Sequence, residues 1–366
     1  MFCEVTEHTT IYDEQLAGQP GIGGWFPGGV RLASGELLVF YSTGEEFEGR
    51  MTLAASRSTD GGHSWVYSGP LFGGAEPEPG NLKPTLLRDG RLAAIGYNFT
   101  LSEGSPLVNP ATGGLAPGAN YIAFSSDGGH RWTPPQRIDT RHPEVLETSG
   151  PCLELGNGDL IASGTPFPMW DGRMPSGRKG FLLRSTDGGR SWADGGIFFQ
   201  TTGGNVAPYE SRMALLPGGR IAIILWCLDE AVGKSRNNHV VFSDDNGFTW
   251  SPPLDTGIAG QASNLLALAD GTLLAIHCVR EGDDTGLHLC RAVIRDGRWE
   301  ILQHTKLWEG ARAGRIGSLA QMGDNLKFGQ PSILALPDGD YLALHWAMTG
   351  KTGRILAHRF RLPELR

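Results

Sequence analysis

Four copies of one eight-residue pattern constrain this sequence more than any other feature. The pattern is Ser-x-Asp-x-Gly-x-x-Trp, and it occupies residues 58–65, 125–132, 185–192 and 243–250. In the third copy, Asp187 can accept hydrogen bonds from the backbone of its own turn, and Gly188 and Gly189 can adopt the positive φ of a two-residue hairpin turn. Trp192 then falls on the returning strand. Four copies indicate an array of strand–turn–strand units.

A second repeat accompanies the octets and consists of two apolar strands joined by a glycine-containing turn. Its six copies occupy residues 29–40, 85–95, 152–162, 213–225, 265–276 and 333–344. Continuous apolar strands are typical of inner positions that are packed on both faces. Each copy is therefore predicted to form the two inner strands of a propeller blade, with an octet joining the two outer strands.

The octet resembles the Asp box of the sialidase superfamily. That resemblance implies a six-bladed β-propeller with its Asp boxes at the outer hairpins, away from the active site. The superfamily includes sialidases, other glycosidases, lyases and binding proteins, so the resemblance implies a fold and leaves the activity open. We expect residues 1–366 to form one all-β domain of six blades.

The sixth blade lacks a fourth strand in its own segment. After residues 333–344, only residues 354–360 have the pattern of a further strand, whereas blade 5 keeps a degenerate octet at residues 295–299. Glu4–Tyr12 precedes blade 1 and is rich in β-branched residues. We expect this segment to pair with residues 354–360 and to close the ring, which removes an exposed sheet edge.

Composition excludes several classes of function. A formal net charge of −8 argues against nucleic-acid binding, and no run of 18 apolar residues predicts a membrane span. The five cysteines are odd in number and form no CxxC motif, so we expect no disulfide framework, no metal site and no cofactor. Free thiols and the absence of a recognisable signal peptide favour a cytoplasmic protein.

Long connections on one face mark where a site is expected. Residues 101–119 and 166–179 interrupt blades 2 and 3, and residues 305–326 join blades 5 and 6, all opposite the octets. The inner strands begin at this face, so their first residues converge near the axis. The polar and aromatic side chains expected there suit a glycan or small saccharide. The candidate substrate-binding residues are Trp25, Lys83, Tyr209, Arg212, His277, Arg280, Gln330, His345 and Trp346.

The resemblance implies that a sialidase has an arginine triad, a tyrosine–glutamate pair and an acidic aspartate at these places. Here Glu210 matches the glutamate, but Trp25 replaces the first arginine and Gln330 replaces the tyrosine. The arginines that could substitute for the triad are Arg212, Arg280, Arg312 and Arg315. We therefore expect a substrate other than sialic acid.

Glu147 and Glu210 are the predicted catalytic pair. Both open inner strands of adjacent blades, and glycoside hydrolysis requires two carboxyl groups that flank the bond. Arg212 favours an ionised Glu210, whereas Glu147 has no cation nearby in sequence and is the expected acid with a raised pKa. Asp171, in an Asp-Gly turn, is the alternative acid. The resemblance offers a precedent, because arabinan-degrading propellers use a glutamate pair, and adjacent blades favour the wider spacing of an inverting enzyme.

Three other functions remain compatible with the sequence. They are an exo-sialidase with a rearranged site, a lyase on uronic acids with His277 or His345 as its base, and a sugar-binding propeller without activity. The tryptophans Trp25, Trp226 and Trp346 could stack on sugars or pack where the inner strands converge. The octet aspartates are assigned to structure alone.

Overall fold

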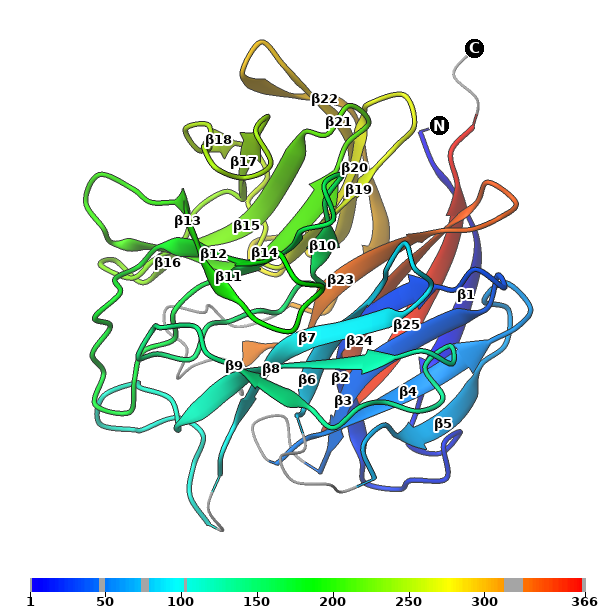
Figure 1. Cartoon of the computed structure of the whole chain (residues 1–366). Helices are drawn as coiled ribbons and strands as arrows, with labels where there is room; N and C mark the ends of the chain where they lie inside the picture. The colour runs from blue at the N-terminus through cyan, green and yellow to red at the C-terminus, as the bar shows by residue number, and fades with distance from the viewer. Residues whose placement is uncertain (1, 46–49, 74–78, 102–103, 313–324, 364–366) are drawn as a thin grey trace.

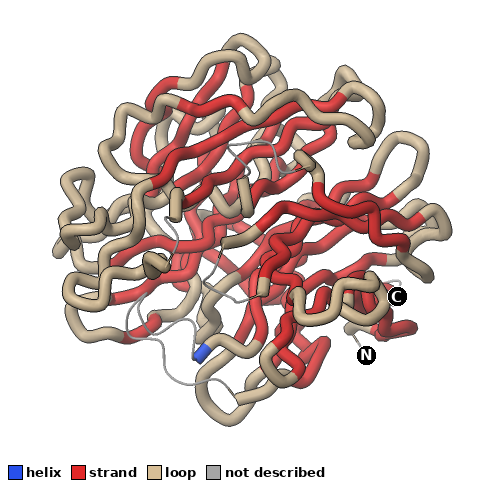
Figure 2. Tube along the Cα trace, turned by 90° about the horizontal axis from the view of Figure 1, so that it is seen from below, coloured by secondary structure: helices blue, strands red, loops and turns tan. Residues whose placement is uncertain are grey.

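The computed structural model describes residues 2–45, 50–73, 79–101, 104–312 and 325–363. These residues form six β-sheets that follow one another along the chain around a common axis, as a six-bladed β-propeller (Figure 1). Strands make up the body of the molecule and loops surround them (Figure 2). None of the described segments is a helix long and apolar enough to span a membrane.

The strands of each blade are numbered from the axis outward. Blade 1 contains β2 (Gly23–Arg31), β3 (Leu37–Gly44), β4 (Thr52–Ser58) and β5 (Val66–Pro70). Blade 2 contains β6 (Asn81–Leu86), β7 (Leu92–Phe99), β8 (Gly118–Ser125) and β9 (Gln136–Ile138). Blade 3 contains β10 (Leu153–Glu154), β11 (Leu160–Gly164), β12 (Gly180–Ser185) and β13 (Ala193–Phe199).

The second half of the ring repeats this order. Blade 4 contains β14 (Val206–Leu215), β15 (Ile221–Asp229), β17 (His239–Ser243) and β18 (Leu254–Asp255), with β16 (Lys234–Ser235) beside β15. Blade 5 contains β19 (Ser263–Ala267), β20 (Leu273–Val279), β21 (Gly286–Arg295) and β22 (Arg298–Glu309). Blade 6 contains β23 (Phe328–Ala335), β24 (Tyr341–Thr349), β25 (Thr352–Arg361) and β1 (Glu4–Tyr12). Each predicted apolar pair thus supplies the two innermost strands of a blade.

The N-terminal strand closes the ring, as predicted. Strand β1 pairs antiparallel with β25, from Glu4 opposite Arg361 to Tyr12 opposite Ile355 (Figure 1). One prediction about the connections is wrong: β22 continues to Glu309, so the loop expected over residues 305–326 starts later. Residues 313–324 of that loop lie outside the described residues.

The octets form the outer connections through local hydrogen bonds. Asp187 Oδ1 accepts from the Ser191 amide at 2.9 Å and from the Ser185 hydroxyl at 2.8 Å. The Trp192 indole donates to the Gly189 carbonyl at 3.2 Å, so the ring folds back over the turn. The expected two-residue turn is wrong here, because β12 ends at Ser185 and β13 begins only at Ala193. The aspartate thus organises a longer loop.

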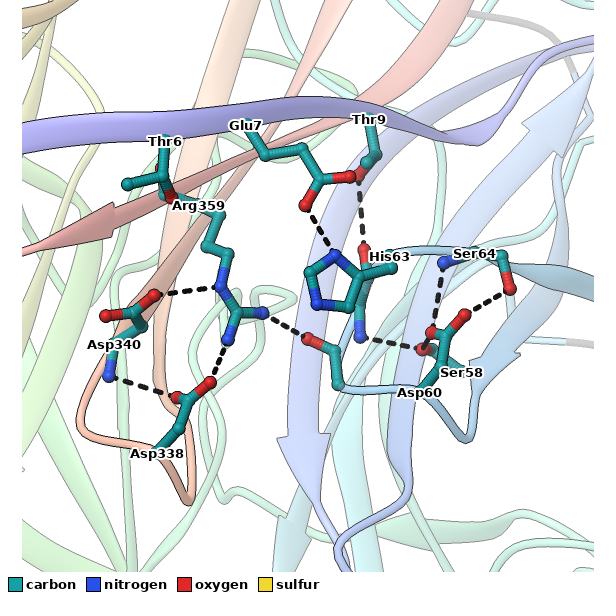
Figure 3. A network of polar contacts seen from close by, with 12 residues as sticks. Thr6, Glu7, Thr9, Ser58, Asp60, His63, Ser64, Asp338, Asp340 and Arg359 are labelled. Atoms are coloured by element: carbon teal, nitrogen blue, oxygen red, sulfur yellow. Dashed lines mark hydrogen bonds and ion pairs between the residues drawn. The ribbon is translucent and has the colours of Figure 1, made fainter.

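Arginines link neighbouring blades on the octet face. Arg57 at the end of β4 pairs with Glu36 of its own blade at 2.9 Å and donates to the Gly128 carbonyl in the octet of blade 2 at 2.9 Å. Arg359 on β25 likewise pairs with Asp340 and donates to the Gly61 carbonyl in the octet of blade 1 (Figure 3). The second link ties the last blade to the first.

Two blades achieve the same link with the residues exchanged. Where phenylalanine precedes the octet serine, the arginine comes from the turn between the two inner strands. Arg91 stacks over Phe124 at 5.4 Å, and Arg220 stacks over Phe242 at 4.6 Å. Arg220 also donates to the Ile294 carbonyl of blade 5 at 3.4 Å. Both arrangements place a cation between blades, where it can satisfy turn carbonyls.

Candidate functional site

Three of the innermost strands in the described chain contain a β-bulge near their start. The register shifts lie between Trp25 and Gly28, between Tyr209 and Arg212, and between Gly329 and Ser332. Each bulge includes one residue other than glycine with a positive φ, namely Phe26 (57°), Glu210 (51°) and Gln330 (40°). Such a conformation is uncommon, and bulges re-aim side chains next to active sites. The bulges therefore mark the face where the inner strands begin.

The bulge of blade 4 brings the predicted carboxylates together. The Glu210 amide donates to Glu147 Oε2 at 2.6 Å, and the Glu147 amide donates to the Thr165 carbonyl at 2.7 Å. Glu147 is 3% exposed and Glu210 is 7% exposed. Glu210 Oε2 is buried and has no hydrogen-bond partner among the described residues. One carboxyl group is thus held by the backbone of the other, whose own oxygen remains available.

Two buried cations accompany the pair. Arg212 donates to the Ser149 hydroxyl at 2.7 Å and to the Ser211 carbonyl at 3.0 Å. Lys83 donates to the Phe26 carbonyl of the blade 1 bulge. We call Lys83, Glu147, Glu210 and Arg212 the axial charge cluster. Its formal charges balance, which permits ionisable groups to be buried together.

Burial sets the protonation states in the axial charge cluster. Burial, followed by the charge of Glu210, raises the pKa of Glu147 to about 7, although Arg212 and Ser149 oppose the rise. Burial, followed by the charge of Arg212, holds the pKa of Lys83 well below its ordinary value. The raised pKa of Glu147 agrees with the prediction and means that protonated and ionised forms coexist near neutral pH.

A small cavity lies under the cluster on the side of the octets. Its volume is about 20 Å³, and all six blades contribute to its wall. The polar side chains that line it are Lys83, Ser149, Arg212, Asn264 and Ser332. This space suits a single water molecule, not a sugar ring. A substrate therefore has to approach the carboxylates from the opposite face.

Two glycines admit the buried cations. A Cβ atom at Gly28 would lie 2.6 Å from Cδ of Lys83, and one at Gly329 would lie 2.1 Å from Nη2 of Arg280. Arg280 is 1% exposed, and its Nε donates to the Phe328 carbonyl at 2.8 Å. Its Nη1 has no hydrogen-bond partner among the described residues, and the same holds for Oε1 of Gln330. Arg280 and Gln330 thus each present an unmatched polar atom.

A tyrosine–carboxylate–arginine chain lies beside the cluster. The Tyr209 hydroxyl donates to Glu230 Oε1 at 2.9 Å, and Arg178 Nε donates to Glu230 Oε2 at 2.5 Å. Burial, followed by Glu230, raises the pKa of Tyr209 well above its ordinary value. Tyr209 therefore remains a neutral donor. Neither Arg178 nor Glu230 was among the candidate site residues.

Tyr97 is a further residue that the sequence analysis missed. It ends its strand next to the site, and burial, followed by the charge of Glu147, raises its pKa. Its ring lies 5.3 Å from Phe167, whose ring in turn lies 6.2 Å from Tyr209. The signal was present, because Tyr97 lies in the last residues of a second inner strand, which were expected to reach this face.

The prediction that tryptophans near the axis stack on sugars is wrong for Trp25 and Trp346. Both rings are fully buried, as is that of Trp226. The Trp25 indole donates to Sδ of Met348 at 3.4 Å, and Trp346 packs edge-on against Phe26 with centroids 6.0 Å apart. A ring with no exposed face cannot stack on a ligand. These tryptophans fill the space where the inner strands converge.

The histidines proposed as bases lie inside the blades. His277 Nδ1 contacts Asn238 Oδ1 at 2.8 Å, and His345 Nε2 contacts His358 Nε2 at 2.8 Å. Burial lowers the pKa of both His277 and His345 to about 3. Both rings are inaccessible to solvent, so their assignment to a substrate site is corrected. The alternation of side chains along a strand turns them toward neighbouring strands and blades.

The alternative acid has the wrong environment for that role. Asp171 is exposed, accepts from the Arg173 amide at 3.0 Å and pairs with the Arg173 side chain at 2.6 Å. These hydrogen bonds lower its pKa, whereas a general acid needs a raised one. Arg312, a potential substitute for a triad arginine, forms an exposed ion pair with Asp283 at 2.6 Å. Arg315 lies outside the described residues.

Comparisons with known proteins agree with this architecture. No protein-family model matches the chain. A sialidase from Micromonospora viridifaciens is 23% identical over 278 residues, which cover 72% of this chain and 34% of that protein. The chain thus spans about a third of the length of this relative.

Solved structures resemble the chain over nearly its whole length. A protein of unknown function from Dyadobacter fermentans has a TM-score of 0.74 and 17% identity, covering 99% of both chains. An α-L-arabinanase from Penicillium chrysogenum in complex with arabinobiose has a TM-score of 0.67 and 13% identity, covering 99% of this chain and all of that one. The fold is therefore one that glycoside hydrolases use.

Proposed function

We propose that this protein is a glycoside hydrolase that cleaves a neutral glycan with Glu147 and Glu210. The observation that carries the proposal is the hydrogen bond from the Glu210 amide to Glu147, because it holds two buried carboxyl groups together at the axis. Glycoside hydrolysis requires such a pair. The relatives support this reaction class, since one is a sialidase and another is an arabinanase.

The two carboxyl groups take different roles in the proposed reaction. Glu147, whose pKa is about 7, supplies the proton to the leaving oxygen as the glycosidic C–O bond breaks. Glu210 accepts a proton from the water that attacks the anomeric carbon, using the oxygen that has no partner in the described chain. We propose inversion because the carboxyl groups come from adjacent blades, which leaves room for that water.

The proposed substrate is a neutral sugar because of the unmatched polar atoms at the site. Glu210 Oε2 and Gln330 Oε1 are acceptors, and Arg280 Nη1 is a donor. Sugar hydroxyls can serve both kinds of partner, whereas a carboxylate offers acceptors only and would face Glu147 and Glu210. The replacements by Trp25 and Gln330 point the same way.

An exo-sialidase with a rearranged site is the second candidate. The observation that favours it is the buried guanidinium of Arg280, because arginine is suited to binding a carboxylate. The sialidase relative supports it as well. In this alternative, Arg280 alone would replace the arginine triad.

Turnover of a panel of aryl glycosides separates these functions. The panel contains α-L-arabinofuranosides, common neutral hexosides and an aryl sialoside, and each is tested with wild type and Glu210→Gln. We expect turnover of a neutral glycoside that Glu210→Gln abolishes. Efficient cleavage of the sialoside would instead establish the second candidate. No turnover of any member, with retained sugar binding, would indicate a binding protein.

A further inference from the structure

Two long connections on the site face are docked on each other. One joins β7 to β8 in blade 2, and the other joins β11 to β12 in blade 3. The Leu115 amide of the first donates to the Pro168 carbonyl of the second at 2.9 Å. Asn109 Nδ2 and Thr112 Oγ1 both donate to the Trp170 carbonyl, at 2.9 and 2.6 Å. The two loops therefore form one wall.

The tip of this wall is fixed by its own backbone. The Met169 amide donates to the Arg173 carbonyl at 3.0 Å, and the Gly172 amide donates to the Met169 carbonyl at 2.7 Å. Gly114 of the other loop lies so near that a Cβ atom there would sit 1.8 Å from the Met169 carbonyl oxygen. The turn that carries Trp170 is thus held from two sides.

Trp170 is the most exposed tryptophan of this protein. All ten tryptophans lie in the described ranges, and Trp170 is 40% exposed, whereas the other nine are buried or half-buried. Exposing a large aromatic ring costs free energy, since its burial is worth about 1.5–3 kcal/mol. A fixed turn that holds such a ring in water gains nothing for folding. It does present a preorganised surface to a ligand.

The loop that carries Trp170 begins and ends at the proposed catalytic site. It leaves β11 through Thr165, whose carbonyl accepts from the Glu147 amide at 2.7 Å. It returns through Arg178, which pairs with Glu230 beside Tyr209. Trp170 lies five residues after Thr165, so the two are at most about 18 Å apart. That span corresponds to a few sugar units.

We propose that Trp170 is the stacking platform of a distal subsite that binds a neutral sugar unit of an oligosaccharide whose scissile bond lies at Glu147 and Glu210. This inference rests on the proposed function and extends it, because it assigns a chain of several sugars as the substrate. The indole offers a flat apolar face to the C–H groups of a sugar ring. The adjacent Asp171 and Arg173 are exposed and offer an acceptor and donors to its hydroxyls.

The test compares Trp170→Ala with Trp170→Phe on two substrates of the same sugar. One is an aryl monoglycoside, which is too short to reach the wall, and the other is an unsubstituted oligosaccharide of four to six units. We expect Trp170→Ala to lower kcat/KM on the oligosaccharide roughly 2- to 10-fold, mainly through KM, as the loss of one aromatic contact predicts. The monoglycoside should be turned over as by wild type, and Trp170→Phe should retain most of the oligosaccharide activity.

Phe248→Ala is the matched control, because Phe248 is an aromatic residue with 68% exposure in an octet on the opposite face. It should change neither substrate. Unchanged oligosaccharide kinetics in Trp170→Ala, or an equal loss on both substrates at an unchanged melting temperature, would overturn the subsite. If wild type cleaves no glycan, the proposed function fails on its own. Calorimetric binding of the same oligosaccharide to wild type and Trp170→Ala then decides the subsite, since equal affinity overturns it and weaker binding by the variant supports it.

Discussion

At the scale of single residues, access to water decides what a carboxyl group can do in this protein. Asp171 and Glu147 both belong to stretches expected at the site. Hydrogen bonds from Arg173 lower the pKa of the exposed Asp171, whereas burial raises that of Glu147 to about 7. The same functional group is thus a permanent anion in one place and a proton donor in the other.

The raised pKa of Glu147 predicts the alkaline limb of the activity. An acid catalyst works only when protonated, so kcat/KM should fall about tenfold per pH unit above pH 7. The measurement is a pH–rate profile with a substrate that has a poor leaving group. Glu147→Gln should lose about 10²–10⁴-fold on that substrate and far less on a dinitrophenyl glycoside, whose leaving group needs no proton. Equal losses on both substrates would remove Glu147 from the acid role.

Glu210 should behave differently from Glu147 in the same assays. Glu210→Gln should lower kcat by about 10²–10⁴-fold or more whatever the leaving group, because activation of water is needed in every case. The fold should remain intact, since the Glu210 amide that binds Glu147 belongs to the backbone. Circular dichroism and the melting temperature check the fold. Near-normal turnover by this variant would contradict the proposed mechanism.

At the scale of the elements, two local devices shape each blade. The octet aspartates organise the outer connections, and the bulges in β2, β14 and β23 re-aim residues at the starts of inner strands. The first device lies far from the carboxylates and the second lies beside them. Changes to the two devices should therefore separate stability from activity.

Asp187→Ala tests that separation. The substitution leaves the Ser191 amide and hydroxyl and the Ser185 hydroxyl without their acceptor. We expect a lower melting temperature and unchanged kcat per folded molecule, with Asp187→Asn recovering part of the loss. Calorimetry and active-site-normalised kinetics measure the two quantities. A large fall in kcat at an unchanged melting temperature would place Asp187 in the mechanism.

At the scale of the whole molecule, closure depends on the first strand of the chain. Strand β1 covers the edge of β25, and the Arg359 network joins that blade to the octet of blade 1 (Figure 3). Glu7 of β1 also contacts His63 of this octet at 2.6 Å. An open sheet edge is a template for pairing with other chains.

Removal of residues 2–12 should therefore expose the β25 edge and cause association. We expect lower thermal stability and higher-order species in size-exclusion chromatography with light scattering. A synthetic peptide of Glu4–Tyr12 added in trans should restore the monodisperse form of the truncated protein. A truncated chain that stays as stable and monodisperse as the intact one would show that β1 is not needed for closure.

Buried histidines predict that the whole molecule loses stability in acid. The pKa is lowered to about 3 in His277 and His345 and to about 2 in His358, in each case chiefly by burial. The unfolded chain binds protons below its ordinary histidine pKa of about 6.5, whereas the folded chain does not. The free energy of unfolding should therefore fall below pH 6.5, by up to about 1.4 kcal/mol per pH unit for each ring.

The raised pKa of Glu147 acts with the opposite sign between its ordinary value and about 7, so it partly offsets the histidines. Urea titrations at pH 7, 6 and 5 measure the slope. His358→Gln should reduce it, because one titrating ring is gone. A pH-independent stability over this range would mean that these rings are not kept neutral by the fold.

Much of the fold could be predicted from the sequence because its signals are local and repeated. The octet contains its own hydrogen-bond acceptor and its glycines, and each apolar pair contains its own turn, so six blades and the closing strand could be identified in advance. The meeting of Glu147 and Glu210 was also predictable in outline, because the starts of inner strands converge at one face. These features follow from strand order alone.

Only the tertiary structure decided which of those converging residues are accessible and what protonation state they adopt. Trp25 and His345 lie on inner strands like Glu210, yet packing between strands and blades buries their rings completely. A shift of one residue at each bulge decides which side chain faces the axis, and a single sequence contains no signal for that shift. The pKa of Glu147 likewise depends on burial and on Glu210 from another blade, and both are set by contacts between segments far apart in the chain.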